Sequence, residues 1–301
     1  MKYFLLFITS LISFHAFAQE RFFYGRVVDQ KKNGIPFCIV EAKDRYEGVY
    51  CDEQGVFSFY ANTDSIKVLM FYVIGYLKKE ISVQNLANDS IIIELQEQPI
   101  NLKEITIFPK KESRKKILGK KRLKYNGDGY SKYGNESAIF LHAEPNKNRF
   151  LNEVFIFITS KGVPNTKFRI HIYEKDSITH LPGKELTDSN LIVNAITGNE
   201  WVKADLSSRR ISIKDGIFIS VEWISGYGNN QTKMALIQHD DIIATYNGQV
   251  LGLTSHYGLQ SLSYYRTGFN NKWSFSDPMK YSFKVYRFLN PMIYCTYRYI
   301  K

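Results

Sequence analysis

The feature that most constrains the fold is a regular series of turn residues between Phe22 and Ile107. Glycine, proline and aspartate recur there at short intervals, and the runs between them are rich in β-branched and aromatic residues. Short runs of this composition, with no long helical pattern between them, are typical of an antiparallel β-sandwich. The sequence therefore predicts strands over residues 22–29, 37–43, 56–60, 65–73, 90–95 and 104–108.

Two of these turns have a clear physical reason. Asp52-Glu53-Gln54-Gly55 places glycine where a tight reversal needs a positive φ, and the Asp52 carboxylate can accept a bond from the backbone two residues later. Gly34-Ile35-Pro36 ends a loop with proline at the first position of a strand, where the missing N–H is least costly. Both turns therefore favour strand boundaries at these points.

A set of landmark residues occurs in a fixed order along this part of the chain: Gly25, Val27, Asp29, Gly34-Ile35-Pro36, Gly48, Asp52, Gly55, Phe57, Ile74-Gly75-Tyr76, Leu95, Leu102 and Glu104-Ile105. Their order resembles the carboxypeptidase regulatory-like domain, a transthyretin-like β-sandwich that is common in envelope proteins of Bacteroidetes. Cys38 and Cys51 depart from the usual pattern, in which Ala and Thr are common, but both replacements exchange one small residue for another. We expect this domain to span residues 19–108.

The resemblance implies an accessory role. In metallocarboxypeptidases this domain is a non-catalytic appendage, and in Bacteroidetes it often precedes a TonB-dependent outer-membrane receptor. We expect no receptor here, because the 177 residues from Tyr125 to Lys301 are too few for its plug and barrel.

The first 18 residues predict a cleavable export signal. A positive start at Lys2 is followed by an apolar stretch from Tyr3 to Phe14 and by the small-x-small pattern Ala16-Phe17-Ala18. We expect the mature chain to begin near Gln19, without a lipid anchor or a later transmembrane segment. The predicted location is the periplasm, the outer membrane or the cell surface.

The basic charge is concentrated in residues 109–124. The whole chain carries +11, and this segment alone holds nine Lys or Arg and one Glu. Such a block is usual in a solvated linker, and its alternative is contact with an anionic envelope surface of lipid head groups or acidic glycan. Nucleic acid fits the charge equally well, but export argues against it. The candidate surface contacts are Lys115, Lys116, Lys120, Lys121 and Arg122.

Residues 125–301 predict a second all-β domain, similar to the jelly-roll modules of secreted adhesins and carbohydrate-binding proteins. Residues 168–173 and 218–223 alternate as strands with one buried face do. The further expected strands are 137–143, 151–159, 201–206, 211–213, 261–266, 281–288 and a closing run over 292–300. The expected fold class is thus all-β, with a transthyretin-like N-terminal and a jelly-roll-like C-terminal β-sandwich.

The sequence indicates no catalytic residue, metal or cofactor. His171 and Glu174 have a zinc-like spacing, but residues three apart on a strand point to opposite faces. His239-Asp240-Asp241 is expected to be an exposed loop. The carboxylate pairs Asp188 with Glu200 and Asp205 with Glu222 are the candidates for a glycosidase site, and they need a cleft to support that role.

The tryptophans are the candidates for ligand recognition, since their flat faces can stack on sugar rings. Trp201 and Trp223 lie within strand alternation and are expected in the core. Trp273 lies in a polar context after Asn270-Asn271-Lys272 and is the candidate binding residue.

Cys38 and Cys51 flank an expected hairpin near residues 44–47. We expect small buried apolar residues there, with a disulfide between neighbouring strands as the alternative.

The predicted function is that of a non-enzymatic exported envelope protein, a β-sandwich spacer joined to a binding module for a protein or glycan partner. The alternative is a hydrolase of surface polysaccharide or peptide with an unrecognised carboxylate site.

Overall fold

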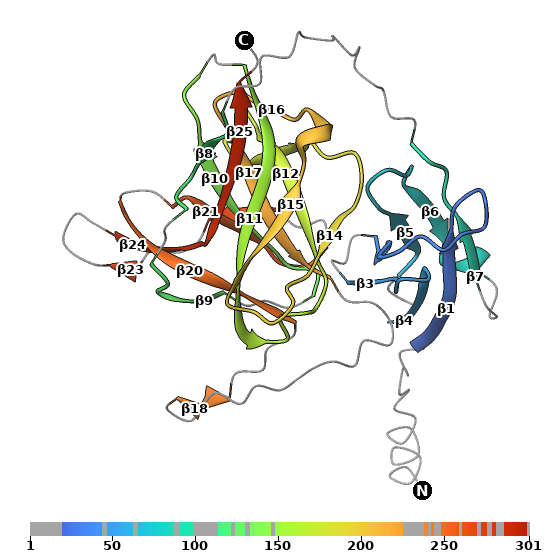
Figure 1. Cartoon of the computed structure of the whole chain (residues 1–301). Coiled ribbons are helices and arrows are strands. Elements are labelled where there is room, and N and C mark those ends of the chain that lie inside the picture. The colour runs from blue at the N-terminus through green and yellow to red at the C-terminus, as the bar shows by residue number, and fades with distance from the viewer. Residues whose placement is uncertain are drawn as a thin grey trace, which may run out of the picture.

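The protein consists of two β units that lie side by side (Figure 1). The described residues contain strands and two short 3-10 turns but no α-helix, so the predicted all-β class is confirmed. The predicted signal, residues 1–18, lies outside the described part, in which no helix is long and apolar enough to span a membrane. The computed structural model describes residues 20–43, 47–62, 66–86, 91–98, 114–121, 124–129, 133–145, 148–224, 238–239, 242–243, 248–258, 261–269, 272–275, 279–280 and 286–299.

The N-terminal unit is a sandwich of a three-stranded and a four-stranded sheet. Phe23, Phe57 and Ile93 from one sheet meet Val40 and Leu69 from the other in a single buried core. The smaller sheet has the order β4 (Val56–Asn62), β1 (Glu20–Val28), β7 (Ile91–Glu94). The larger has the order β3 (Gly48–Tyr50), β2 (Ile39–Ala42), β5 (Val68–Tyr72), β6 (Lys79–Ser82), followed by the turn η1 (Val83–Asn85).

The predicted turn before β4 is present. Gly55 has φ +79, and a Cβ there would lie 2.4 Å from the Val27 carbonyl oxygen. The Asp52 carboxylate accepts the N–H groups of Gln54 and Val56, both at 2.8 Å. One pairing differs from the expected antiparallel arrangement, because β7 runs parallel to β1. The expected strand over 104–108 lies outside the described residues.

The C-terminal unit is a larger two-sheet sandwich. The seven-stranded sheet has the order β13 (Pro182–Glu185), β12 (Phe168–Lys175), β17 (Gly216–Trp223), β10 (Glu136–His142), β21 (Ser263–Arg266), β22 (Ser274–Phe275), with β14 (Leu191–Val193) beside β12. The nine-stranded sheet has the order β23 (Met279–Lys280), β24 (Tyr286–Pro291), β20 (Gln249–Gly258), β11 (Arg149–Gly162), β25 (Ile293–Tyr299), β8 (Lys116–Leu118).

Short strands complete this unit. In the nine-stranded sheet, β15 (Glu200–Asp205) and β16 (Ser212–Ile213) pair with β11, while β9 (Gly127–Gly129) pairs with β20. The turn η2 (Ser207–Arg209) follows β15, and β18 (Gln238–His239) pairs with β19 (Ile242–Ile243) in a separate two-stranded sheet.

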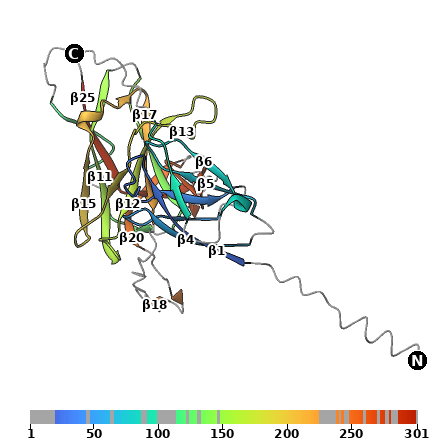
Figure 2. The ribbon, with the colours of Figure 1, turned by 90° about the vertical axis from the view of Figure 1, so that its right-hand side faces the viewer.

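Strand β12 is buried on both faces. Phe168, Ile170 and Ile172 lie in the core of the C-terminal sandwich. The residues between them, Arg169 and His171, are also buried although they point away from that core. The outer face of this sheet is therefore covered, and the N-terminal unit lies against it (Figure 2).

Part of the basic segment belongs to a sheet of the C-terminal unit. Residues 116–118 form β8, an edge strand that pairs antiparallel with β25. Lys115 lies beside this strand and pairs with Glu153 at 2.9 Å. Leu118 is buried in the sandwich core, and this burial is the physical reason that the segment joins the sheet.

Candidate functional site

A row of four charged residues crosses the outer face of the seven-stranded sheet. The strand register places Arg169 of β12 opposite Glu222 of β17, Glu222 opposite Glu136 of β10, and Glu136 opposite Arg266 of β21. Direct cross-strand partners lie within side-chain contact. The two carboxylates are therefore neighbours at the centre of the row, with one guanidinium at each end.

Glu222 is bonded through both carboxylate oxygens. Its Oε2 lies 2.7 Å from Arg169 Nη1 and 3.0 Å from His171 Nε2. Its Oε1 accepts the hydroxyl of Tyr50, at 2.7 Å, from the N-terminal unit. Burial raises the pKa of Glu222, but Arg169 and His171 outweigh it and hold the pKa well below the usual range.

Glu136 has hydrogen-bond partners at one oxygen and an ion-pair partner at the other, all within the C-terminal unit. Its Oε1 accepts the hydroxyls of Tyr173, at 3.0 Å, and of Ser220. Its Oε2 lies 2.5 Å from Arg266 Nη2. The neighbouring carboxylates thus each have a cationic partner, which offsets the repulsion between them.

His171 lies one rung away from the row and bridges two carboxylates. Its Nδ1 lies 2.8 Å from Glu185 Oε2, and its Nε2 contacts Glu222. Burial lowers the pKa of His171, but the carboxylates of Glu136 and Glu185 outweigh it and raise that pKa to about 10. The imidazole is therefore a cation at neutral pH, and both of its nitrogens act as donors.

The N-terminal unit covers this row with the hairpin formed by β2 and β3. Arg169 Nη2 donates to the Phe37 carbonyl oxygen at 2.6 Å, and its guanidinium lies 5.8 Å from the Tyr50 ring centre. Around these polar contacts, Phe37, Ile39 and Tyr50 pack with Ile224 and Phe269 of the C-terminal unit in one buried cluster. The interface thus combines buried apolar packing with buried charged contacts.

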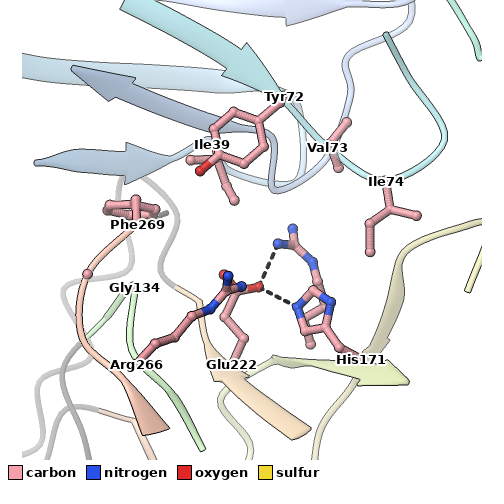
Figure 3. A pocket seen from close by; sticks show the side chains of 11 residues that line it. Ile39, Tyr72, Val73, Ile74, Gly134, His171, Glu222, Arg266 and Phe269 are labelled. Carbon is pink, nitrogen blue, oxygen red and sulfur yellow. Dashed lines mark hydrogen bonds and ion pairs between the residues drawn. The ribbon is translucent and has the colours of Figure 1, made fainter. Parts of the chain in front are cut away.

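A cavity of about 80 Å³ remains between the two units. Figure 3 shows Ile39, Tyr72, Val73 and Ile74 on its N-terminal side, facing Arg266, Glu222 and His171 on the other. This volume holds a few water molecules and is far below the roughly 300 to 1,000 Å³ of a typical ligand site.

A second cavity of about 280 Å³ opens between the two sheets of the C-terminal unit. Leu251, Leu253, Leu289 and Pro291 form its apolar wall, and Glu136 and Arg266 of the charged row lie on its polar side.

The structure brings the candidate ligand residue Trp273 to the edge of the charged row. Its ring lies 5.1 Å from the Arg266 guanidinium and 5.9 Å from the Tyr173 ring, edge to face. Trp223 is buried in the C-terminal core, as predicted. Trp201 is half-buried and packs edge to face against Phe157 and Tyr294.

The candidate surface cations are arranged unequally. Lys115 pairs with Glu153, and Lys116 lies 5.0 Å from the Tyr299 ring centre. Lys120 and Lys121 are exposed. Arg122 lies outside the described residues.

The candidate carboxylate pairs have other partners. Asp188 pairs with Arg209, and Glu200 Oε1 accepts the backbone N–H groups of residues 196–198. Asp205 accepts the N–H of Ser207 and lies on the opposite sheet from Glu222.

No metal-ligating group of three acidic, histidine or cysteine residues occurs in the described part of the chain. The side chains of His239, Asp240 and Asp241 lie outside that part.

Comparison with known proteins bears on the N-terminal unit. Residues 23–107 match the model of the CarboxypepD_reg-like domain. This match confirms, for residues 23–107, the domain expected from the glycine and aspartate landmarks. No curated protein matches the chain.

Two solved structures of the major pilin subunit BcpA of Bacillus cereus are distantly similar. The D312A form is 12% identical with a TM-score of 0.19, and the other form is 10% identical with a TM-score of 0.18. In each case the match covers 85% of this chain and 66% of the pilin chain. The chain thus spans slightly less than two thirds of the length of the pilin. Scores this low relate neither the folds nor the functions of these proteins.

The charged row was not predicted as a site. Arg169, Glu136 and Arg266 are distant in sequence and become neighbours only through strand pairing. The sequence did contain one signal of a polar face at this place. Strand 168–173 carries Arg169 and His171 on the face opposite to its apolar residues, and such a face is usually exposed to water.

Proposed function

We propose that this protein is a non-enzymatic exported envelope protein in which a CarboxypepD_reg-like spacer and a jelly-roll-like binding module act as one rigid block. The observation that carries this proposal is the charged row at the interface. Its charged side chains bond to one another and to the N-terminal unit, so they serve the docking of the two units.

The same arrangement argues against the hydrolase alternative. A general acid or base needs a carboxylate that can reach a substrate in a cleft. Both oxygens of Glu222 accept hydrogen bonds from protein donors, whereas Glu136 accepts hydrogen bonds through Oε1 and forms an ion pair with Arg266 through Oε2. The cavity beside Glu222 is about 80 Å³, too small for a sugar ring with its neighbours.

The proposed binding partner is a glycan or protein of the envelope, and Trp273 is the proposed contact. Trp273 lies beside a cation and a second aromatic ring and is only partly buried. An indole held by such neighbours has a fixed orientation, which reduces the entropy lost on binding.

The test uses the full chain produced with its signal in a bacterium that has two membranes. Cell fractionation and the mass of the N-terminal peptide report export and cleavage after Ala18. The purified protein is then incubated with isolated envelope polysaccharide. We expect retention without shortening of the polymer, and weaker retention of Trp273→Ala. Cytoplasmic, uncleaved protein or shortening of the polymer would contradict the proposal.

A further inference from the structure

The geometry points to a disulfide between Cys38 and Cys51 that staples the hairpin carrying the interface. We propose that this bond forms when the exported chain folds, so the inference rests on the proposed export. The bond closes the hairpin from the inner side, while the residues beside each cysteine contact the C-terminal unit.

The two cysteines are direct neighbours across the hairpin. The register of β2 and β3 pairs Ile39 with Tyr50, so the next pair outward is Cys38 with Cys51. The Cys51 N–H donates to the Cys38 carbonyl oxygen at 2.8 Å. Opposite residues on antiparallel strands have Cα atoms about 4.5 to 5.5 Å apart, which lies within the range that disulfides span.

The side chains point to the same side of the hairpin. Both cysteines are fully buried in the core of the N-terminal unit, together with Val40. The structure holds both as free thiols, and burial together with the neighbouring Cys38 thiol raises the pKa of Cys51. Neither side chain has to leave the core for a bond to form between the two sulfur atoms.

The alternation of the strands links this bond to the interface. Phe37 and Ile39 flank Cys38, and Tyr50 precedes Cys51; all three contact the C-terminal unit. A bond that fixes the inner face of the hairpin also fixes the spacing of Phe37 and Tyr50. The Phe37 carbonyl accepts a hydrogen bond from Arg169, and the Tyr50 hydroxyl donates one to Glu222.

The chemistry is a two-electron oxidation. Two S–H bonds break, one S–S bond forms, and two protons leave. The two electrons pass to the disulfide of a thiol–disulfide exchange protein of the export compartment, which becomes a dithiol. The attacking species is a thiolate, and burial raises the pKa of the Cys51 thiol in the folded unit. Oxidation therefore precedes the closure of the core.

Cys295 provides an internal standard for the test. All three cysteines are buried free thiols in the structure, and Cys295 lies on β25 of the other unit, so it counts one thiol per chain in every sample. The exported full-length protein is denatured without reductant, alkylated and mapped by mass spectrometry. We expect one alkylated thiol and a linked pair of peptides containing Cys38 and Cys51. After reduction we expect three alkylated thiols.

A second arm separates this inference from the export proposal. The purified full chain is reduced, unfolded and refolded with oxidised and reduced glutathione, so the oxidant no longer depends on the compartment. We expect the same linked pair, formed much faster during refolding than in reduced native protein. Free Cys38 and Cys51 after this refolding would overturn the inference, whatever the location of the protein. A different outcome would overturn export instead. In that case the protein from cells would keep its signal and have free Cys38 and Cys51, while the refolded protein would contain the bond.

Variants test the effect on stability. Adding a reductant is expected to lower the melting temperature of the oxidised wild type by several degrees, because an open hairpin gains conformational freedom when unfolded. Cys38→Ala and Cys51→Ala should each lose this response while keeping the fold, whereas Cys295→Ala should retain it. An equal response in all three variants would contradict a Cys38–Cys51 bond.

Discussion

Arg169 and Glu222 face each other across β12 and β17 with Nη1 and Oε2 2.7 Å apart, and both side chains are almost fully excluded from water. Removing two charges from water is costly, and their attraction repays that cost only when further hydrogen bonds complete the geometry. Tyr50 and the Phe37 carbonyl supply such bonds from the N-terminal unit. The pair is thus completed by docking of the two units, which gives the interface a defined register.

Breaking this pair is expected to be strongly destabilising. Glu222→Gln leaves the buried Arg169 and His171 without the carboxylate that both contact. We expect a loss of about 3–5 kcal/mol in the free energy of unfolding, measured by urea denaturation. The matched control is Glu80→Gln, since Glu80 forms an exposed pair with Lys43 and its removal should cost far less. Equal losses in the two variants would contradict the role of the buried row.

The stability is expected to fall in alkaline solution through His171. The pKa of this imidazole is about 10 in the folded protein, against an ordinary value of about 6.5 in the unfolded chain. Because the folded pKa is raised, the contribution to stability is complete below about pH 6.5 and is lost as the pH rises towards 10.

The measurement compares the wild type with His171→Gln over this pH window. The wild type should lose on the order of a few kcal/mol of unfolding free energy between pH 6.5 and 10, and the variant much less. The difference between the two proteins removes the contribution of the lysines and tyrosines that titrate at similar pH. Parallel curves for both proteins would show that His171 is not held as a cation by Glu185 and Glu222.

The coupling between the units is expected to depend on the Tyr50 hydroxyl. Tyr50→Phe keeps the ring in the apolar cluster but removes the donor to Glu222 Oε1. A hydrogen bond to a buried charged group contributes about 1.5–3 kcal/mol. We expect this loss to appear as uncoupled unfolding of the two units.

The chain offers a direct assay of that uncoupling, because its three tryptophans all lie in the C-terminal unit. Tryptophan fluorescence therefore follows this unit alone, while far-UV circular dichroism follows both units. The two denaturation curves should coincide in the wild type and separate in Tyr50→Phe. Tyr60→Phe is the matched control, since the Tyr60 side chain is exposed on the outer sheet of the N-terminal unit. Separate curves in the wild type would contradict the rigid block.

The local parts of this architecture were predictable, and the interface was not. The turn at Asp52 and Gly55 could be predicted because its cause lies within four consecutive residues. The alternation that buries Ile170 and Ile172 follows from the period of a strand. In contrast, the contact of Arg169 with Glu222 joins two residues that are 53 positions apart in the sequence. It depends on the register between their strands, which the local sequence pattern does not determine.

The segment 109–124 shows the same limit. Its charge density predicts a solvated linker, and charge is a good guide to exposure when no neighbour is known. Lys116 is nevertheless part of β8, where it covers the Tyr299 ring, and Leu118 enters the core. Sequence composition does not reveal the free edge of β25 that β8 completes.

Trp273 is expected to contribute to both stability and binding. Trp273→Ala removes a cation–π contact with Arg266 and an edge-to-face contact with Tyr173, each worth about 0.5–2 kcal/mol. Trp273→Phe keeps an aromatic face for ligand stacking and is the matched control. We expect retention on envelope polysaccharide to fall for Trp273→Ala and to be largely kept by Trp273→Phe at a temperature where both are folded. Equal retention by all three proteins would place the ligand elsewhere.

The exposed lysines of the basic segment are expected to carry any attraction to an anionic surface. Lys120 and Lys121 project into solvent, whereas Lys115 is paired with Glu153. Each cation close to an anionic bilayer adds about 1 kcal/mol of attraction, and salt screens it. The double variant Lys120→Gln with Lys121→Gln should therefore reduce co-sedimentation with phosphatidylglycerol vesicles at low salt by at least tenfold. Lys115→Gln should have a smaller effect, because the charge of Lys115 is already partly compensated by Glu153. Neutral phosphatidylcholine vesicles provide the second control, and binding to them that equals binding to anionic vesicles would show that charge is not the cause.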